Sequence, residues 1–153
     1  MNREQLLTRL DTTWTALKAS YAGLSDAQLT QPGVTDDWSV KDILAHVATW
    51  EEEALKYLPL ILADRRPPRY ATLYGGVDAF NAQMTDQKRG LSLAEVQRLL
   101  DDTHRQLIAY IHSVPDEQFT RETRFRRRLR LDTYSHYPIH TQMIHDWRER
   151  LAG

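Results

Sequence analysis

Three histidines form the pattern in this sequence that is best able to do chemistry. His136 and His140 are spaced i, i+4, which places two imidazoles on one face of a helix, about one turn apart. His46 lies in a separate helix-forming segment, so a second helix can bring a third imidazole to the pair. Neutral imidazole binds nickel, zinc, iron and copper, and three histidines with an open position are typical of catalytic metal sites. The pattern predicts a histidine site, with or without a metal.

The same histidines also have a simpler structural interpretation. His46, on a helix face beside Trp50, could be a buried and hydrogen-bonded core residue, and His136, near a helix start, could be solvated. Pro138 lies between the two histidines and affects whether they share a helix face. With Ser135 as the N-cap, proline takes the third helical position, where no intrahelical bond is lost and the two imidazoles keep a common face. An earlier start would bend the helix between them. We therefore expect the cap at Ser135.

Neighbouring side chains extend the candidate site. Tyr134 and Tyr137 flank the histidine pair, and their hydroxyls can transfer a proton or hold a ligand, although aromatic residues on a helix face are more often core. Glu53, further along the His46 helix, can orient an imidazole or act as a base; the alternative is a solvated carboxylate. The candidates are His136, His140 and Tyr137 for catalysis, His46, Trp50, Glu53 and Tyr57 for substrate binding, and His46, His136 and His140 for a metal.

Hydrophobic periodicity predicts that long helices carry these residues. Apolar side chains at intervals of three and four mark four segments, near 3–22, 39–64, 77–113 and 135–151. Capping-box sequences begin the second segment and the second half of the third, which Gly90 interrupts. Only residues near 124–131 alternate in a way that resembles a strand. The predicted fold class is all-α, with the four helices packed as a bundle at shallow crossing angles.

Composition limits the class of protein. The 153 residues suffice for one domain, which we expect to span 1–153 without a disulfide or a structural metal. The chain has no cysteine, which excludes thiolate catalysis and disulfides and fits a reducing, cytoplasmic compartment. Its formal net charge of -1 offers no global attraction to nucleic acid or to an anionic membrane. No signal peptide or membrane span is predicted. We expect a small-molecule ligand, no nucleic acid and no membrane partner.

A cluster of arginines precedes the last predicted helix, and such a cluster can contact phosphate. Few aromatic residues are interleaved with it, and the acidic residues Glu122 and Asp132 bracket it, which weakens a local positive field. We therefore expect a solvated loop or an interface there, not a nucleic-acid site. The cluster comprises Arg121, Arg124, Arg126, Arg127, Arg128 and Arg130.

The order of these segments resembles that of a known family. Residues 38–51, WSVKDILAHVATWE, are similar to the second-helix signature of the DinB-like superfamily. Residues 77–83, VDAFNAQ, 91–96, LSLAEV, and 133–140, TYSHYPIH, resemble the ClbS/DfsB branch of that superfamily. The resemblance covers nearly the whole chain. It implies a DinB-like up-down-down-up four-helix bundle, often a homodimer, with a pocket where the second and fourth helices meet.

The resemblance also implies chemistry at that pocket. DinB-like proteins commonly hold a divalent metal, such as nickel, zinc or iron, at the positions of His46, His136 and His140, and some are thiol-dependent transferases or hydrolases. The ClbS/DfsB branch is linked with self-resistance to reactive metabolites, and a metal is not assured there. Three functions stay open: a hydrolase or detoxifying enzyme acting on an electrophilic metabolite, a metal-dependent thiol transferase or hydrolase, and a binding module that sequesters the metabolite without turnover.

Overall fold

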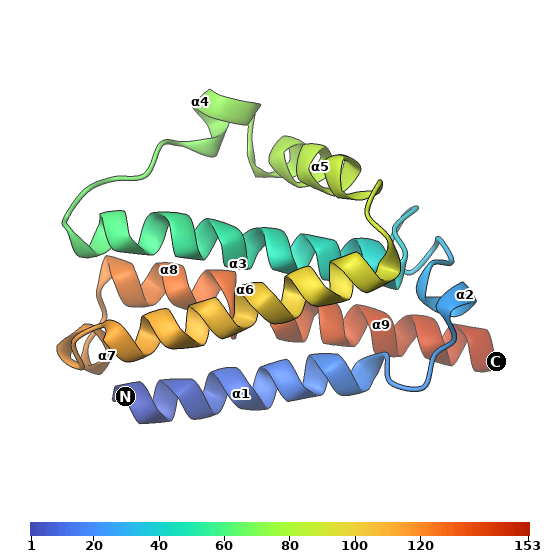
Figure 1. Ribbon diagram of the computed structural model, residues 1–153, viewed down its shortest axis with the longest axis horizontal. Helices are drawn as coiled ribbons and strands as arrows, with labels where there is room; N and C mark the ends of the chain where they lie inside the picture. The colour runs from blue at the N-terminus through green and yellow to red at the C-terminus, as the bar shows by residue number, and fades with distance from the viewer.

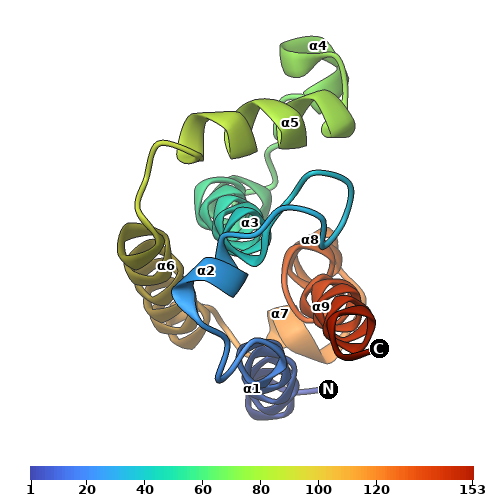
Figure 2. The ribbon, with the colours of Figure 1, turned by 90° about the vertical axis from the view of Figure 1, so that its right-hand side faces the viewer.

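Four long helices form the body of the protein in the computed structural model, which describes residues 1–153 (Figure 1). They are α1 (Arg3–Ser20), α3 (Val40–Leu62), α6 (Leu93–Ser113) and α9 (Tyr137–Ala152). Helices α1 and α9 run in one direction and α3 and α6 in the opposite one (Figure 1). Viewed along their axes, the four lie around a common centre (Figure 2). No element is a strand, so the all-α prediction is confirmed.

Short helices fill the connections between the long ones. Helices α4 and α5 form an arm that lies over α3, with α5 packed on α3 and α4 packed on α5 (Figure 2). Helix α8 also packs on α3. None of the helices is both long and apolar enough to cross a membrane. The short helices are α2 (Asp26–Leu29), α4 (Tyr70–Tyr74), α5 (Val77–Lys88), α7 (Glu117–Thr120) and α8 (Arg124–Asp132).

Helix α8 corrects the strand-like interpretation of residues 124–131. Its buried side chains are Phe125, Leu129 and Asp132, which are spaced i, i+4 and i+7 and so follow a helical period. Five of the arginines in the cluster therefore belong to a helix, not to a loop. The Thr123 hydroxyl begins this helix by accepting a hydrogen bond from the Arg126 amide at 3.0 Å.

Local capping sets where the helices that carry the site begin. Ser39 accepts from the Asp42 amide at 3.1 Å, and the Asp42 carboxylate accepts from the Ser39 amide at 3.0 Å, which is the predicted capping box. Ser92 and Glu95 begin α6 in the same way.

The start of α9 differs from the sequence prediction, which placed the N-cap at Ser135. The helix begins at Tyr137, with His136 in the cap position and no side-chain cap. The amides of His136 and Tyr137 instead donate to the carbonyl of Thr133 at 2.8 and 2.9 Å. Because this turn supplies the acceptor, a capping hydroxyl is not needed. Pro138 still lies in the first turn, where it displaces no hydrogen bond, and the two histidines share a face.

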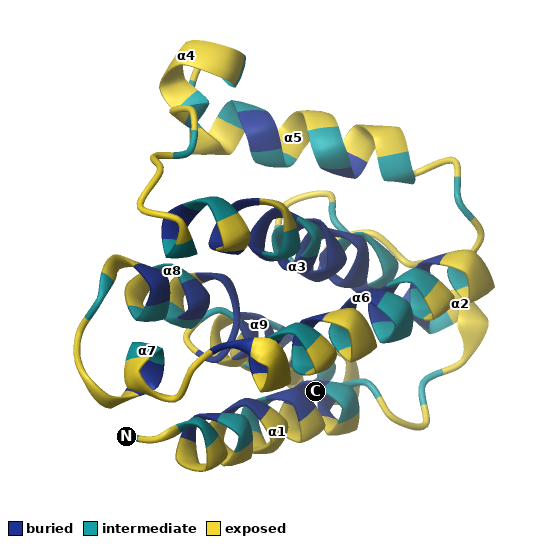
Figure 3. Cartoon of the chain, turned by 60° about the vertical axis from the view of Figure 1, so that its left-hand side comes forward, coloured by how far each residue is buried: buried dark blue, intermediate teal, exposed yellow.

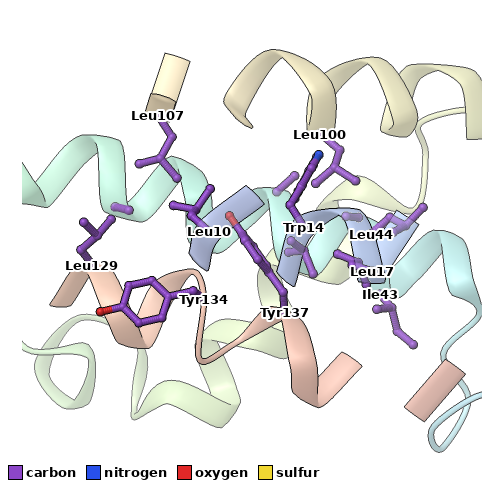
Figure 4. Close-up of a cluster of buried hydrophobic side chains, with 14 of the residues drawn as sticks. Leu10, Trp14, Leu17, Ile43, Leu44, Leu100, Leu107, Leu129, Tyr134 and Tyr137 are labelled. Carbon is purple, nitrogen blue, oxygen red and sulfur yellow. The ribbon is translucent and has the colours of Figure 1, made fainter. Parts of the chain in front are cut away.

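Helix α3 is the most enclosed of the long helices (Figure 3). Its packing against α5, α6 and α8 covers it on several sides. Its face toward α1 and α6 joins a core of leucine and aromatic side chains (Figure 4). Because α3 is covered so widely, its polar residues His46, Glu51 and Glu53 are buried as well. Buried polar side chains need partners, and these partners define the site.

Candidate functional site

The three predicted histidines meet between α3 and the start of α9. Nε2 of His136 lies 3.1 Å from Nε2 of His46 and 2.9 Å from Nε2 of His140. One ring nitrogen from each lies within 4.8 Å of the others. His46 and His140 are buried and His136 is partly exposed. The structure therefore brings together the three residues that the sequence proposed as one cluster.

The surroundings keep these imidazoles neutral. Burial, reinforced by the neighbouring imidazoles, lowers the pKa of His46 to about 3 and that of His140 to about 2. Burial also lowers the pKa of His136 to about 4. All three rings are therefore uncharged at neutral pH, which is the form in which imidazole offers a lone pair to a metal.

Hydrogen bonds cannot satisfy all of the contacts among the three rings. Nε2 of His136 faces a ring nitrogen on each side. A single nitrogen offers either one hydrogen or one lone pair, so it cannot form a full hydrogen bond with both neighbours. Nδ1 of His140 is buried without a hydrogen-bond partner. Three neutral imidazole nitrogens converging in this way match the donor set of a divalent metal such as zinc or nickel.

A cavity of about 450 Å³ opens beside the histidines. Helix α3, the α4–α5 arm and α8 surround it, and the turn after α8 contributes His136. Its size falls in the range of sites for small organic ligands. The lining combines apolar, aromatic and charged side chains: His46, Trp50, Tyr70, Val77, Asn81, Arg128, Leu131, Asp132 and His136.

A chain of hydrogen bonds fixes the charged wall of this cavity. Arg128 donates to a carboxylate oxygen of Asp132 and to the Tyr70 hydroxyl, both at 2.6 Å. The Tyr70 hydroxyl donates to Glu53 Oε1 at 3.1 Å. The Arg128 guanidinium also lies over the rings of Trp50, Tyr57 and Tyr70, at 5.9, 5.4 and 5.7 Å from their centroids. Burial raises the pKa of Asp132 to about 6, although Arg128 opposes this shift.

The remaining predicted site residues occupy different places. Trp50 lines the cavity, and its indole N–H donates to Asn81 Oδ1 at 2.9 Å. Glu53 and Tyr57 lie behind the lining, where they contact Tyr70 and Arg128.

The tyrosines that flank the histidine pair belong to the core. The Tyr137 hydroxyl donates to Glu51 Oε2 at 2.7 Å, and Tyr137 is fully buried beside Trp14 (Figure 4). Tyr134 is buried in the same apolar cluster.

Sequence reasoning missed six residues of the cavity wall: Tyr70, Val77, Asn81, Arg128, Leu131 and Asp132. Arg128 and Asp132 did carry a signal, because opposite charges spaced i, i+4 are typical of a helix face. That signal was hidden because the segment resembled a strand. Tyr70 belongs to α4 and Asn81 to α5. No local sequence pattern indicates which side chains of these two helices face the cavity.

The fold and the histidine centre define a class: an all-helical protein with three imidazoles beside a small-molecule-sized cavity. The sequence matches the DinB superfamily over residues 9–143, and the chain belongs to that superfamily. Protein YuaE of Bacillus subtilis is 28% identical over 116 residues, which are 71% of this chain and 69% of YuaE.

Solved structures agree with this assignment at the level of the fold. DfsB, a sibling lethal factor precursor, superposes with a TM-score of 0.79 at 17% identity, over 99% of this chain and 97% of DfsB. The colibactin self-resistance protein ClbS, in complex with double-stranded DNA, gives a TM-score of 0.79 at 14% identity, over 95% of this chain and 94% of ClbS. The predicted resemblance to a ClbS/DfsB-like protein of the DinB superfamily is confirmed.

The ClbS complex contradicts one expectation, that no nucleic acid would be a partner. A protein of this fold does bind duplex DNA. The expectation was wrong because it relied on the net charge of the whole chain, and a net charge of -1 does not describe one face of the molecule. It also omitted three exposed arginines that lie far from the cluster in sequence, namely Arg65, Arg66 and Arg69.

Proposed function

We propose that this protein is a metal-dependent enzyme that acts on an electrophilic small molecule, as a hydrolase or a detoxifying enzyme. His46, His136 and His140 would hold one divalent cation, with nickel, zinc and iron as candidates. The observation that carries the proposal is the meeting of three neutral imidazole nitrogens beside a cavity of about 450 Å³. A metal bound in this way supplies a water that is nucleophilic near neutral pH.

The cavity wall has the groups that such a reaction needs. Trp50 offers an aromatic face on which a ligand can pack. The Asn81 carbonyl oxygen is occupied by Trp50, so its NH₂ group remains to donate to a ligand. Asp132 lies on the same wall, and its pKa of about 6 is close enough to neutral for it to accept and return a proton. Arg128 holds Asp132 in place.

Metal binding tests this proposal directly. Purified protein titrated with nickel or zinc in a calorimeter should bind one equivalent, and His140→Ala should abolish that binding. His145→Ala is the matched control, because His145 lies on the same helix but is exposed. Equal metal binding by the wild type and His140→Ala would exclude the proposed centre.

Turnover separates the enzyme from a binding module in the same pocket. An electrophilic probe, such as an activated ester or an epoxide, should be consumed in many equivalents per protein by the metal-loaded enzyme. Loss of one equivalent only would indicate sequestration. A rate that rises with added thiol would indicate the transferase alternative, in which the thiol comes from a co-substrate because the chain has no cysteine.

We propose a second function, contact with duplex DNA, at one edge of the pocket. The segment after α3 is tied to α8 at two points: Arg124 pairs with Asp64 at 3.1 Å, and Arg128 donates to Tyr70 at 2.6 Å. Arg65, Arg66 and Arg69 therefore lie in a connection that contacts α8 at both ends. The connection and α8 together present a group of exposed arginines, here called the arginine ridge: Arg65, Arg66, Arg69, Arg124 and Arg127.

The arginine ridge suits a phosphate backbone because its charge is largely uncompensated. Only Arg124 among its members forms an ion pair, and that pair is exposed. Fluorescence anisotropy with a labelled duplex should show that Arg65→Ala/Arg66→Ala weakens binding and lowers the salt dependence by about one unit per lost phosphate contact. Arg98→Ala/Arg105→Ala, at exposed positions of α6, is the control. Equal losses of duplex affinity in the two double variants would exclude the arginine ridge as the DNA contact.

A further inference from the structure

Glu51 is a fully buried carboxylate that belongs to no wall of the cavity. Its Oε1 accepts from the Thr103 hydroxyl at 2.9 Å. Its Oε2 lies 2.8 Å from Nδ1 of His104 and accepts from the Tyr137 hydroxyl at 2.7 Å. Burying a carboxylate is strongly unfavourable unless hydrogen-bond donors surround it. This one has three, so its place in the core is specific.

The partners of Glu51 join the four long helices at one level. Thr103 and His104 belong to α6, Tyr137 belongs to α9, and Glu51 itself belongs to α3. The ring of His104 stacks on that of Trp14, from α1, with centroids 3.6 Å apart and planes inclined by 4°. Tyr137 meets the same indole edge to face, at 5.4 Å. A polar network therefore joins α3, α6 and α9, and ring contacts with Trp14 link it to α1.

The network lies next to the histidine cluster along the chain. Tyr137 directly follows His136 and precedes His140 by three residues, in the first turn of α9. A hydrogen bond that holds the Tyr137 hydroxyl on Glu51 fixes the rotation of this turn about its axis. Since Glu51 is five residues beyond His46 on α3, it ties that rotation to the helix that carries His46. Few residues of α3 and α9 approach each other closely.

We propose that Glu51 is a positioning residue, which acts through Tyr137 to hold His136 and His140 facing His46, so that the three can share a metal. The proposal builds on the metal centre proposed above. Tyr137 then serves orientation, not proton transfer, because its hydroxyl is bonded to Glu51 within the core. Partners that orient metal ligands in this way typically change metal affinity by about 10- to 100-fold when they are removed.

Two single-group deletions at the same carboxylate test the proposal. Tyr137→Phe removes the donor from α9, and Thr103→Val removes a donor from α6; both keep nearly the same volume. Calorimetric titration with zinc should give an affinity about 10- to 100-fold lower for Tyr137→Phe. Thr103→Val should bind zinc as the wild type does. Thermal unfolding of both variants shows whether their losses of stability are comparable.

The outcomes separate this inference from the proposed metal centre. Unchanged zinc affinity in Tyr137→Phe, or an equal loss in both variants, would overturn the role of Glu51 while leaving the centre in place. If the wild type binds no zinc or nickel, the metal centre fails, and crystal structures of the wild type and Tyr137→Phe decide instead. The His46 to His136 separation of 3.1 Å should then lengthen in the variant, and an unchanged separation would overturn the inference.

Discussion

Nε2 of His46 lies 3.1 Å from Nε2 of His136, although the two residues are 90 positions apart in the sequence. Nε2 of His136 faces both His46 and His140, and a single ring nitrogen cannot form a full hydrogen bond with each of them. A shared cation would resolve this, because each ring could then donate a lone pair at about 2.0 to 2.1 Å.

The metal-free protein should become less stable on mild acidification. The folded state holds the pKa values of His46, His136 and His140 at about 3, 4 and 2, below the ordinary histidine value of 6.5. The unfolded chain therefore binds more protons below pH 6.5, and each histidine removes up to about 1.4 kcal/mol of unfolding free energy per pH unit. Asp132 opposes this below about pH 6, because its pKa is raised.

Urea unfolding between pH 7 and pH 5 measures this dependence. His140→Gln should have a shallower dependence than the wild type, because one buried imidazole is gone. A wild-type stability that rises steadily from pH 7 to pH 5 would contradict the buried, neutral state of the histidines.

Replacing Glu51 should be among the most destabilising changes on α3. Glu51→Ala would leave the donors of His104 and Tyr137 without their acceptor in the core, while the Thr103 hydroxyl keeps the Leu100 carbonyl at 3.0 Å. We expect a loss of about 3 kcal/mol in the free energy of unfolding. Glu52→Ala is the control, because the ion pair of Glu52 with Lys88 is partly exposed and should contribute about 1 kcal/mol or less. Equal losses in urea unfolding would show that the Glu51 network is not specific.

Removing Arg128 should raise the pKa of Asp132 further. The guanidinium donates to Asp132 at 2.6 Å and stabilises its charged form, while burial favours the neutral form. In Arg128→Met, the Asp132 carboxyl should titrate above pH 6 when it is followed by carbon NMR. Arg127→Met, on the exposed side of α8, should leave that titration unchanged. A pKa that falls in Arg128→Met would contradict the ion pair.

The sequence determines some parts of this structure locally. The capping boxes at Ser39 and Ser92 and the spacing of His136 and His140 involve neighbours along one helix, so they could be predicted. The contact of this pair with His46 depends on how α9 packs against α3. Only the family resemblance indicated that contact. Local patterns carry no such information.

Other parts of the site depend on packing that no short segment specifies. Arg128 turns inward while Arg127, its neighbour, is exposed, and only the position of α8 against α3 distinguishes them. Tyr70 lines the cavity because α4 and α5 fold back over α3, which brings its hydroxyl to Arg128 and Glu53. Tyr137 was expected to face the ligand and instead contacts Glu51, a residue whose burial was not evident from the sequence.

Anomalous diffraction tests the central claim most directly. Crystals of the wild-type protein soaked with zinc or nickel, with data collected on both sides of the metal absorption edge, should show one strong peak between α3 and the start of α9. The peak should lie about 2.0 to 2.1 Å from one ring nitrogen each of His46, His136 and His140, and it should vanish in His140→Ala. No peak at the three imidazoles, with density for the metal only elsewhere, would contradict the account.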